Sequence, residues 1–568
     1  MTKLFSVILL LLLSAGSVFA QSPPKTSSRV LLIPLDDRPP CLQFPVKMGL
    51  IGDAEIVTPP REMLGRFTEF GKSDEIIKWL KTQNLKSFDA AIISVDMLAY
   101  GGLVAMRVHE TDDATAARRI EFVREMRKLA PKLKIYGSSV IMRLAPTGSV
   151  VNEAYREKLA KWAEISVDET QATATEKLEK SIPAEALADY KAARARDLKI
   201  NRASIELVRD KVFDYLILSQ DDAKPKGVHV ADRENLITEI KRLNLSEKIA
   251  VQPGADEVSM LLLARVLTDK YNYRPKIKAI YSSEQIADQF MPYEDRALRQ
   301  TVSFHIKAVG ANEVATEAEA DIVFYVYVSR FENGKAEEFA NEVQTNYRRV
   351  EGDSISQIWN GKGVIVADVD PKGDVQGADA AFTEALKDKG LFQQLSGYAS
   401  WNTAGNTIGT ALPQGVLYSL IRTKFGFNER KWETTRADFN RRVRVLERVQ
   451  FGQHWFMLNR LFDDYIYHSV VRPQAIKYAK DKGWNVFRFS GEETKAVEQF
   501  SFQKVKDEIR PIINRMALLN VSHGNLYVCE TVKNYNFSLP WGRTFEAEID
   551  FQLDCRKLDN PKIKPKKL

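Results

Sequence analysis

The predicted fold follows from one stretch, Leu216-Ile217-Leu218-Ser219-Gln220-Asp221-Asp222-Ala223-Lys224-Pro225-Lys226-Gly227. Its apolar start is typical of a buried parallel strand, and the strand ends in two adjacent carboxylates and a loop that contains proline and glycine. Two neighbouring carboxylates repel each other, and this repulsion is unfavourable unless a partner of opposite charge offsets it or the site uses the charge. The same layout, an apolar run followed by polar side chains, recurs along the chain and predicts that these polar clusters meet at one acidic site.

Apolar strands alternate with amphipathic helices along most of the chain, a pattern that predicts parallel βαβ units and an α/β fold. Polar clusters at the carboxyl ends of such strands favour a (β/α)8-type barrel, whose active sites lie at that end. An open doubly wound parallel sheet is the alternative, because it also binds ligands at the carboxyl ends of its strands. The predicted strands are residues 29–34, 54–60, 88–96, 134–142, 214–222, 248–252, 276–281, 321–328 and 363–369.

Three parts are predicted along the chain: a signal peptide at residues 1–20, a barrel-like α/β domain at 28–425 and an α+β domain at 427–568. Residues 1–20 combine a basic start, an apolar run and small residues near Ala20, as secretory signal peptides do. A charged, helix-prone region at 149–213 is interpreted as a helical insertion at the rim of the α/β domain. We therefore expect an exported protein, periplasmic or extracellular, without a membrane anchor.

Composition excludes several classes of protein. The net charge of +7 is spread over 568 residues, which argues against a nucleic-acid partner. The six histidines show no zinc-binding spacing, and no glycine-rich phosphate loop or nucleophilic-serine elbow is present. The three cysteines do not form a disulfide scaffold or a metal-thiolate site. Cys529 and Cys555 are expected either to pair in an oxidising compartment or to remain buried free thiols.

Four acids at predicted strand ends are the candidate catalytic residues: Asp221, Asp222, Asp256 and Glu257. At the end of a strand both members of the first pair can reach the mouth of a barrel. One carboxylate would then orient or stabilise charge, while the other, with a raised pKa, donates a proton. The second pair precedes an apolar helix, so capping of that helix is an alternative explanation.

Nine further residues at strand ends are candidates for substrate binding: Asp36, Asp37, Arg38, Asp96, Tyr100, Arg143, Trp401, Asn402 and Asn406. The acids and arginines would hold sugar hydroxyls, or would form internal ion pairs that fix loops. Trp401 would stack on a sugar ring with Asn402 beside it, although asparagine is also common in turns. No metal ligand is assigned among these residues.

Five motifs of the chain resemble a bacterial family that is catalogued as domain of unknown function 4127. They are Leu35-Asp36-Asp37-Arg38-Pro39, Ser94-Val95-Asp96-Met97-Leu98-Ala99-Tyr100-Gly101-Gly102, Asp221-Asp222, Pro253-Gly254-Ala255-Asp256-Glu257 and Trp401-Asn402-Thr403-Ala404-Gly405-Asn406. The resemblance extends over nearly all of the chain after residue 20 and implies no activity.

A looser likeness, limited to Asp221-Asp222 with Asn402 as a helper, is to retaining β-N-acetylglucosaminidases. It implies that the acetamido oxygen of the substrate attacks, that one aspartate orients the amide, and that the other is the general acid/base.

These observations predict a hydrolase, specifically a secreted glycoside hydrolase that needs no cofactor and acts on a glycan or small glycoside, N-acetylated sugars included. One alternative is a hydrolase of amide or phosphate bonds in which the acids hold Mg²⁺, Mn²⁺ or Ca²⁺. The other is a periplasmic carbohydrate-binding protein without catalytic activity.

Overall fold

The computed structural model of the chain describes residues 26–558 except 150, 331, 348–361, 375, 427–434, 487, 514–517 and 523–524. The predicted signal peptide at residues 1–20 lies outside the described residues. In the part of the chain that the structure describes, no helix has the length and apolar character needed to cross a membrane.

The first half of the chain forms a six-stranded sheet in which every pair of neighbouring strands is parallel. Its strands are β1 (Ser28–Ile33), β2 (Ala54–Val57), β3 (Ala90–Ser94), β4 (Lys134–Ile141), β5 (Tyr215–Gln220) and β6 (Ile249–Pro253). Alternate residues of these strands are buried in two separate hydrophobic clusters, one on each face. The near-continuous apolar runs in the sequence are therefore explained by burial on both faces.

A second parallel sheet follows, in the order β11-β10-β9-β7-β8. Its strands are β7 (Lys276–Tyr281), β8 (Asn312–Glu313), β9 (Ile322–Tyr327), β10 (Gly363–Asp368) and β11 (Gly397–Ala399). The α/β class is confirmed, but the described strands form two open sheets and no closed barrel. The barrel would require β7 to continue the first sheet beside β6, whereas β7 pairs with β8 and β9.

The two sheets share one topology, although the chain has no repeat of sequence. The first sheet has the order β2-β1-β3-β4-β5-β6, and the second has the corresponding order β8-β7-β9-β10-β11 when it is read from β8. This is the order of a doubly wound sheet, which binds ligands at the carboxyl ends of its strands. The open-sheet alternative therefore describes the observed topology better than the barrel does.

Helices α11 (Val258–Lys270) and α16 (Ala404–Phe425) pack against each other, and their residues join one hydrophobic core with residues of both sheets. The predicted apolar helix after β6 is thus confirmed as α11. Further helices around the sheets are α1 (Gln43–Ile51), α2 (Ser73–Thr82), α3 (Val95–Ala99), α4 (Leu103–Met106), α5 (Asp113–Ile120), α6 (Phe122–Leu129), α10 (Val228–Arg242), α12 (Glu284–Ala287), α13 (Leu298–Ala308), α14 (Lys335–Thr345) and α15 (Ala380–Asp388).

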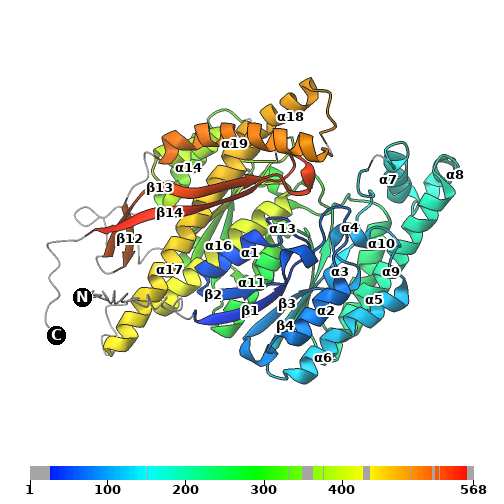
Figure 1. Cartoon of the computed structure of the whole chain (residues 1–568), viewed down its shortest axis with the longest axis horizontal. Helices are drawn as coiled ribbons and strands as arrows, with labels where there is room; N and C mark the ends of the chain where they lie inside the picture. The colour runs from blue at the N-terminus through cyan, green and yellow to red at the C-terminus, as the bar shows by residue number, and fades with distance from the viewer. Residues whose placement is uncertain are drawn as a thin grey trace, which may run out of the picture.

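The region expected to be a helical insertion forms α7 (Arg156–Ile165), α8 (Ala172–Glu179) and the long α9 (Ala184–Arg209). Helix α9 packs on β4 and β5, while α7 and α8 extend beyond the sheet at one end of the molecule (Figure 1).

The C-terminal part combines helices with an antiparallel sheet. It consists of α17 (Arg436–Arg460), a π-helix (Leu461–Val471), α18 (Arg472–Asp481), α19 (Gly491–Ile513) and an antiparallel sheet of β12 (Leu518–Ser522), β13 (Asn525–Ser538) and β14 (Glu548–Leu558). Helix α17 packs against α1 and α16, and the long strands β13 and β14 run beside α17 and α19 (Figure 1). A 3₁₀ turn at Pro540–Gly542 joins these two strands at the end nearest the first sheet.

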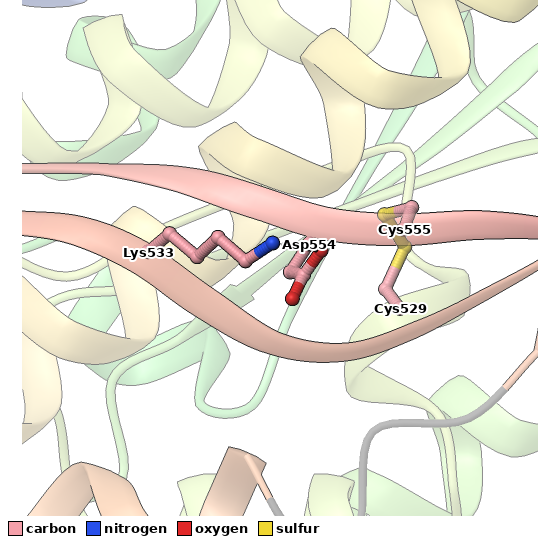
Figure 2. Close-up of a disulfide and its surroundings, with 4 residues drawn as sticks. All are labelled: Cys529, Lys533, Asp554 and Cys555. Atoms are coloured by element: carbon pink, nitrogen blue, oxygen red, sulfur yellow. Dashed lines mark ion pairs between the residues drawn. A yellow bond between two sulfur atoms is a disulfide. The ribbon is translucent and has the colours of Figure 1, made fainter.

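A disulfide joins β13 to β14 (Figure 2). Cys529 and Cys555 stand directly opposite each other in the antiparallel pair and are bonded through their sulfur atoms. An ion pair between Lys533 Nζ and Asp554 Oδ1, 2.7 Å long, crosses the same two strands. Of the two states that the sequence left open for these cysteines, the structure has the disulfide, and the buried Cys41 is free.

Replacing Cys529 and Cys555 together by alanine is expected to lower the free energy of unfolding by about 3 kcal/mol, because the disulfide restricts the unfolded chain. Denaturant unfolding of the wild type and the double variant measures this difference. Thiol titration of the denatured, unreduced wild type is the control and should find only the thiol of Cys41. Three free thiols, or equal unfolding midpoints, would contradict the assignment.

Candidate functional site

A cavity of about 680 Å³ lies where the carboxyl ends of both sheets meet the C-terminal part. From the first sheet it is lined by Arg38 after β1, Arg107 after β3, Arg143 after β4, Asp221 and Asp222 after β5, and Asp256 after β6. The region of the second sheet contributes Gln376, Asn402, Thr403 and Asn406, and the C-terminal part contributes Arg472, Trp541, Arg543 and Phe545. The predicted convergence of polar strand ends is therefore observed, with the two sheets contributing jointly.

Seven of the predicted site residues line this cavity: Arg38, Arg143, Asp221, Asp222, Asp256, Asn402 and Asn406. The other six predicted residues, Asp36, Asp37, Asp96, Tyr100, Glu257 and Trp401, are buried outside its wall.

Trp401 cannot serve as the expected platform for a sugar ring in this structure. The side chain is only 3% exposed, its ring packs edge-on against Phe44, and its Nε1 donates a hydrogen bond to Thr410 Oγ1 at 3.0 Å. An aromatic side chain better placed for stacking is Tyr293, which lines the cavity and is 51% exposed.

Asp96 and Tyr100 support the fold beneath the site. Asp96 accepts a hydrogen bond from the backbone N–H of Val140 at 3.0 Å, and the Arg196 guanidinium lies 4.1 Å from the centre of the Tyr100 ring. Burial, reinforced by the nearby Asp197, raises the pKa of Asp96 well above its ordinary value. Asp96 and Tyr100 therefore stabilise the protein interior, whereas the sequence predicted that they bind substrate.

Arg38 holds the first wall of the cavity together. Its guanidinium donates to Asp36 at 2.7 and 3.0 Å, to Asp256 at 2.6 and 3.1 Å, and to Glu546 of the C-terminal part at 3.1 Å. Burial lowers the pKa of Arg38, but the carboxylates of Asp256 and Asp36 more than offset it and raise the pKa well above its ordinary value. The internal ion-pair interpretation of this motif is therefore the one that the structure supports.

The loop after β1 also contacts the turn between β13 and β14. The indole Nε1 of Trp541 donates to Asp37 Oδ1 at 2.7 Å, and the Arg38 guanidinium lies 4.5 Å from the Trp541 ring centre. Burial raises the pKa of Asp37, although the hydrogen bond from Trp541 opposes this shift. These contacts fix the C-terminal part on the opening of the first sheet.

Asp221 and Asp222 diverge and each meets a different arginine. Asp221 accepts from Arg107 at 2.6 and 3.1 Å, and Asp222 accepts from Arg143 at 2.7 Å. Although burial raises the pKa of Asp221, Arg107 and Arg143 bring it below its ordinary value. Burial and Arg143 lower the pKa of Arg107 to about 10. The lowered pKa of Asp221 fits the charge-stabilising member of the predicted pair and not the proton donor.

Glu294 is a cavity carboxyl group that combines a raised pKa with the lack of an arginine partner among the described residues. It is 3% exposed, its Oε1 accepts from the backbone N–H of Gly405 at 2.9 Å, and its Oε2 has no hydrogen-bond partner among the described residues. Burial raises its pKa to about 8, and the charges of Glu257 and Asp222 act in the same direction. The residue lies in the loop between α12 and α13, where no motif or strand end indicated it.

Strained backbone gathers at the cavity. Five lining residues other than glycine have left-handed φ angles, which are rare for bulky side chains. They are Phe67 at 49°, Tyr293 at 66°, Gln376 at 54°, Asn402 at 57° and Trp541 at 63°. Strain of this kind persists where surrounding structure enforces it, and it concentrates at functional sites. The cavity therefore combines a polar lining with backbone conformations that are common at functional sites.

Gly254 separates the cavity from the buried Glu257. Its φ is +97°, and a Cβ atom at this position would lie 1.7 Å from Glu257 Oε1. Glu257 is fully buried, and its nearest cationic candidate is His305, whose Nε2 lies 3.5 Å from Glu257 Oε1. Glu257 thus supports the site from behind and does not reach the cavity.

Replacing Gly254 by alanine is expected to lower the free energy of unfolding by about 2–4 kcal/mol, because overpacking adds to the penalty of a left-handed φ. The matched control is Gly390→Ala, where φ is +65° and no heavy atom lies within 4 Å of the new Cβ. That variant should lose only about 1–2 kcal/mol. Equal losses in chemical denaturation would show that Gly254 does not depend on close packing with Glu257.

The described residues contain no group of three or more His, Cys, Asp or Glu side chains arranged to hold a metal ion. Instead, three of the cavity carboxylates are bound by arginines: Asp221 by Arg107, Asp222 by Arg143 and Asp256 by Arg38. The donor set is therefore one of ion pairs, with no preformed all-oxygen cage.

Comparison with known protein families gives one match. The model of a family described as "Protein of unknown function (DUF4127)" matches residues 30–550. The chain belongs to this family. The match includes every cavity residue of this DUF4127 protein, from Arg38 to Phe545. No curated protein and no solved structure matches the chain.

Proposed function

We propose that this DUF4127 protein is a secreted glycoside hydrolase with Glu294 as its general acid. The observation that carries the proposal is a contrast within one cavity. Burial raises the pKa of Glu294 to about 8, whereas Arg107 and Arg143 outweigh burial and lower the pKa of Asp221. Glycoside hydrolysis uses one carboxyl group as proton donor and a second, ionised one that stabilises positive charge, attacks the sugar or activates water.

In this mechanism Glu294 donates the proton on Oε2 to the glycosidic oxygen as the bond to the sugar breaks. Gly405 N–H holds Oε1 in place, so Oε2, which has no partner among the described residues, is the oxygen that would carry the proton. Asp222 has a half-exposed side chain in the cavity and is the carboxylate available to the reacting sugar carbon or to water. Asp221, held by Arg107, accepts a hydrogen bond from the backbone N–H of Asp222 and orients it.

Two further features support the proposal. The cavity volume of about 680 Å³ falls within the range of sites that enclose small ligands, and Tyr293 offers an exposed ring for a sugar face. The Cys529–Cys555 disulfide supports export, because such bonds persist mainly in oxidising compartments.

The two alternatives derived from the sequence differ in their support. Hydrolysis of amide or phosphate bonds with Mg²⁺, Mn²⁺ or Ca²⁺ is less favoured. Three carboxylates that could bind the ion, those of Asp221, Asp222 and Asp256, already form ion pairs with arginines. A binding protein without catalytic activity is favoured by those same ion pairs, which would hold a sugar between two sheets of equal topology. Turnover separates the proposal from this second candidate.

The test measures reducing sugar released from a panel of glycans and aryl glycosides by the wild type, Glu294→Gln and Asp222→Asn. We expect turnover of at least one β- or α-glycoside by the wild type and loss of turnover in both variants with the fold intact. Binding without product, or full activity of Glu294→Gln, would overturn the proposal.

A further inference from the structure

We infer that the ligand of this cavity carries an oxyanion, which Arg472 binds from the C-terminal part. The inference rests on the proposed function only in taking the ligand to be a sugar. In chemical terms the substrate is then an anionic saccharide, such as a uronate, or a sugar with a phosphate or sulfate ester.

The cations of the cavity wall are all of one kind. Among the described residues the lining includes seven arginines and neither lysine nor histidine: Arg38, Arg107, Arg143, Arg156, Arg472, Arg488 and Arg543. The guanidinium group is planar, always charged and shaped to bind the two oxygens of a carboxylate or phosphate. Recognition of sugar hydroxyls alone would not require so many arginines.

Two of the seven arginines, Arg472 and Arg488, form no ion pair among the described residues. Arg488 is exposed to solvent, whereas the side chain of Arg472 is partly buried. Arg38, Arg107, Arg143, Arg156 and Arg543 each form an ion pair with Asp or Glu. By contrast the Nε of Arg472 is buried and has no hydrogen-bond partner in the described part of the chain. Burial lowers the pKa of Arg472, although the charge of Glu546 opposes the shift, so an anionic ligand in the cavity would stabilise this cation.

The guanidinium groups of Arg472 and Arg543 lie close to the same aromatic ring. The Arg472 and Arg543 guanidiniums lie 5.2 and 5.1 Å from the centre of the same Phe545 ring. Arg543 is already bound to Glu546, a carboxylate that it shares with Arg38. Of these two arginines Arg472 is therefore the one free to bind a ligand, with the Phe545 ring as an apolar neighbour for the sugar.

The backbone around this corner is held in place by the π-helix that ends next to Arg472. Tyr467 donates its hydroxyl hydrogen to the Thr544 carbonyl at 2.7 Å, and His468 Nε2 lies 3.2 Å from the Phe545 carbonyl. The π-helix thus fixes the position of Arg472, which follows it directly, and of residues 544–545, which it binds through hydrogen bonds. π-Helical segments of this kind are rare and frequently mark functional sites.

The test measures binding to the full chain by calorimetry, with Glu294→Gln used so that no substrate is consumed. Glucuronate, galacturonate and glucose 6-phosphate are compared with glucose, and inorganic phosphate and sulfate are added alone. At least one anionic sugar should bind about tenfold or more tightly than glucose. The carboxylate and phosphate arms identify the source of the oxyanion.

Arg472→Gln should abolish this preference, and Arg472→Lys should retain only part of it, because lysine keeps the charge and loses the planar fork. Arg274→Gln, which removes a surface arginine paired with Asp269, is the control and should keep the preference. Equal affinity for glucose and its anionic counterparts, or an unchanged preference in Arg472→Gln, would overturn the inference. Binding of inorganic phosphate or sulfate without a preference for any anionic sugar would do the same.

The outcome also separates this inference from the proposed function. Tight binding of anionic sugars without turnover by the wild type supports the inference and contradicts the hydrolase. Turnover of neutral glycosides without a preference for anions supports the hydrolase and contradicts the inference.

Discussion

Replacing Arg38 by methionine should lower the free energy of unfolding by about 3–5 kcal/mol, because it removes the shared partner of buried carboxylates. Asp36, Asp256 and Glu546 all bind this guanidinium, and each is almost fully buried. Methionine matches much of the volume but supplies no charge. Burial already raises the pKa of Asp256 to about 7 even in the presence of Arg38, so its carboxylate alone would be poorly tolerated.

Denaturant unfolding at neutral pH measures the loss. The matched control is Arg299→Met, since Arg299 also binds two carboxylates, Glu284 and Asp288, but does so on the surface. That variant should lose less than about 1 kcal/mol. The double variant Arg38→Met/Asp256→Asn should recover part of the loss. Similar losses for Arg38→Met and Arg299→Met would contradict the role assigned to the buried ion pairs.

Replacing Glu294 by glutamine should reduce turnover of the true glycoside by a factor of about 10² to 10⁴, the usual contribution of a general acid. Glutamine keeps the oxygen that accepts from Gly405 and loses the proton that would be donated. Turnover rates of the two proteins on the same glycoside measure the effect. A rate reduced less than about tenfold would remove Glu294 from the proposed mechanism.

The same variant should become more stable than the wild type as the pH rises, because glutamine has no proton to lose. The pKa of Glu294 is about 8 in the folded protein against an ordinary value of 4.5. The folded state therefore holds the proton more tightly, and the stability that this provides is present below pH 4.5 and is lost as the pH rises through 8. Relative to the wild type, Glu294→Gln should gain on the order of a few kcal/mol over that window.

Unfolding free energies of both proteins across this pH range test the gain. Glu247→Gln, which changes an exposed glutamate paired with Lys307, is the control and should follow the wild type at every pH. A stability difference between Glu294→Gln and the wild type that does not change with pH would indicate an ordinary carboxyl group.

Much of the fold could be predicted because burial on both faces of parallel strands leaves a direct mark in the sequence. β1, β3, β4, β5, β6, β7, β9 and β10 all coincide with predicted apolar runs. The division into two sheets could not be predicted in the same way. This division depends on the packing of α11 and α16 between the sheets. Packing between helices so far apart in the sequence leaves no periodic pattern of residues.

The site was predicted best where it is built from strand ends. Asp221, Asp222, Asp256, Arg38 and Arg143 line the cavity because parallel strands end on one side of a sheet. Glu294, Arg472 and Trp541 were missed because they lie in a loop, at a helix start and in a turn far along the chain. Trp401 was misassigned because its neighbours in sequence resembled a binding loop, whereas its ring belongs to the core.

Difference infrared spectroscopy can test, without a known substrate, whether Glu294 keeps its proton at neutral pH. Spectra of the wild type minus those of Glu294→Gln, recorded from about pH 5 to about pH 10, cancel the other carboxyl groups. We expect one protonated carboxyl signal that disappears with a midpoint near the pKa of about 8. A difference spectrum that shows an ionised carboxylate already at about pH 6 would contradict this account.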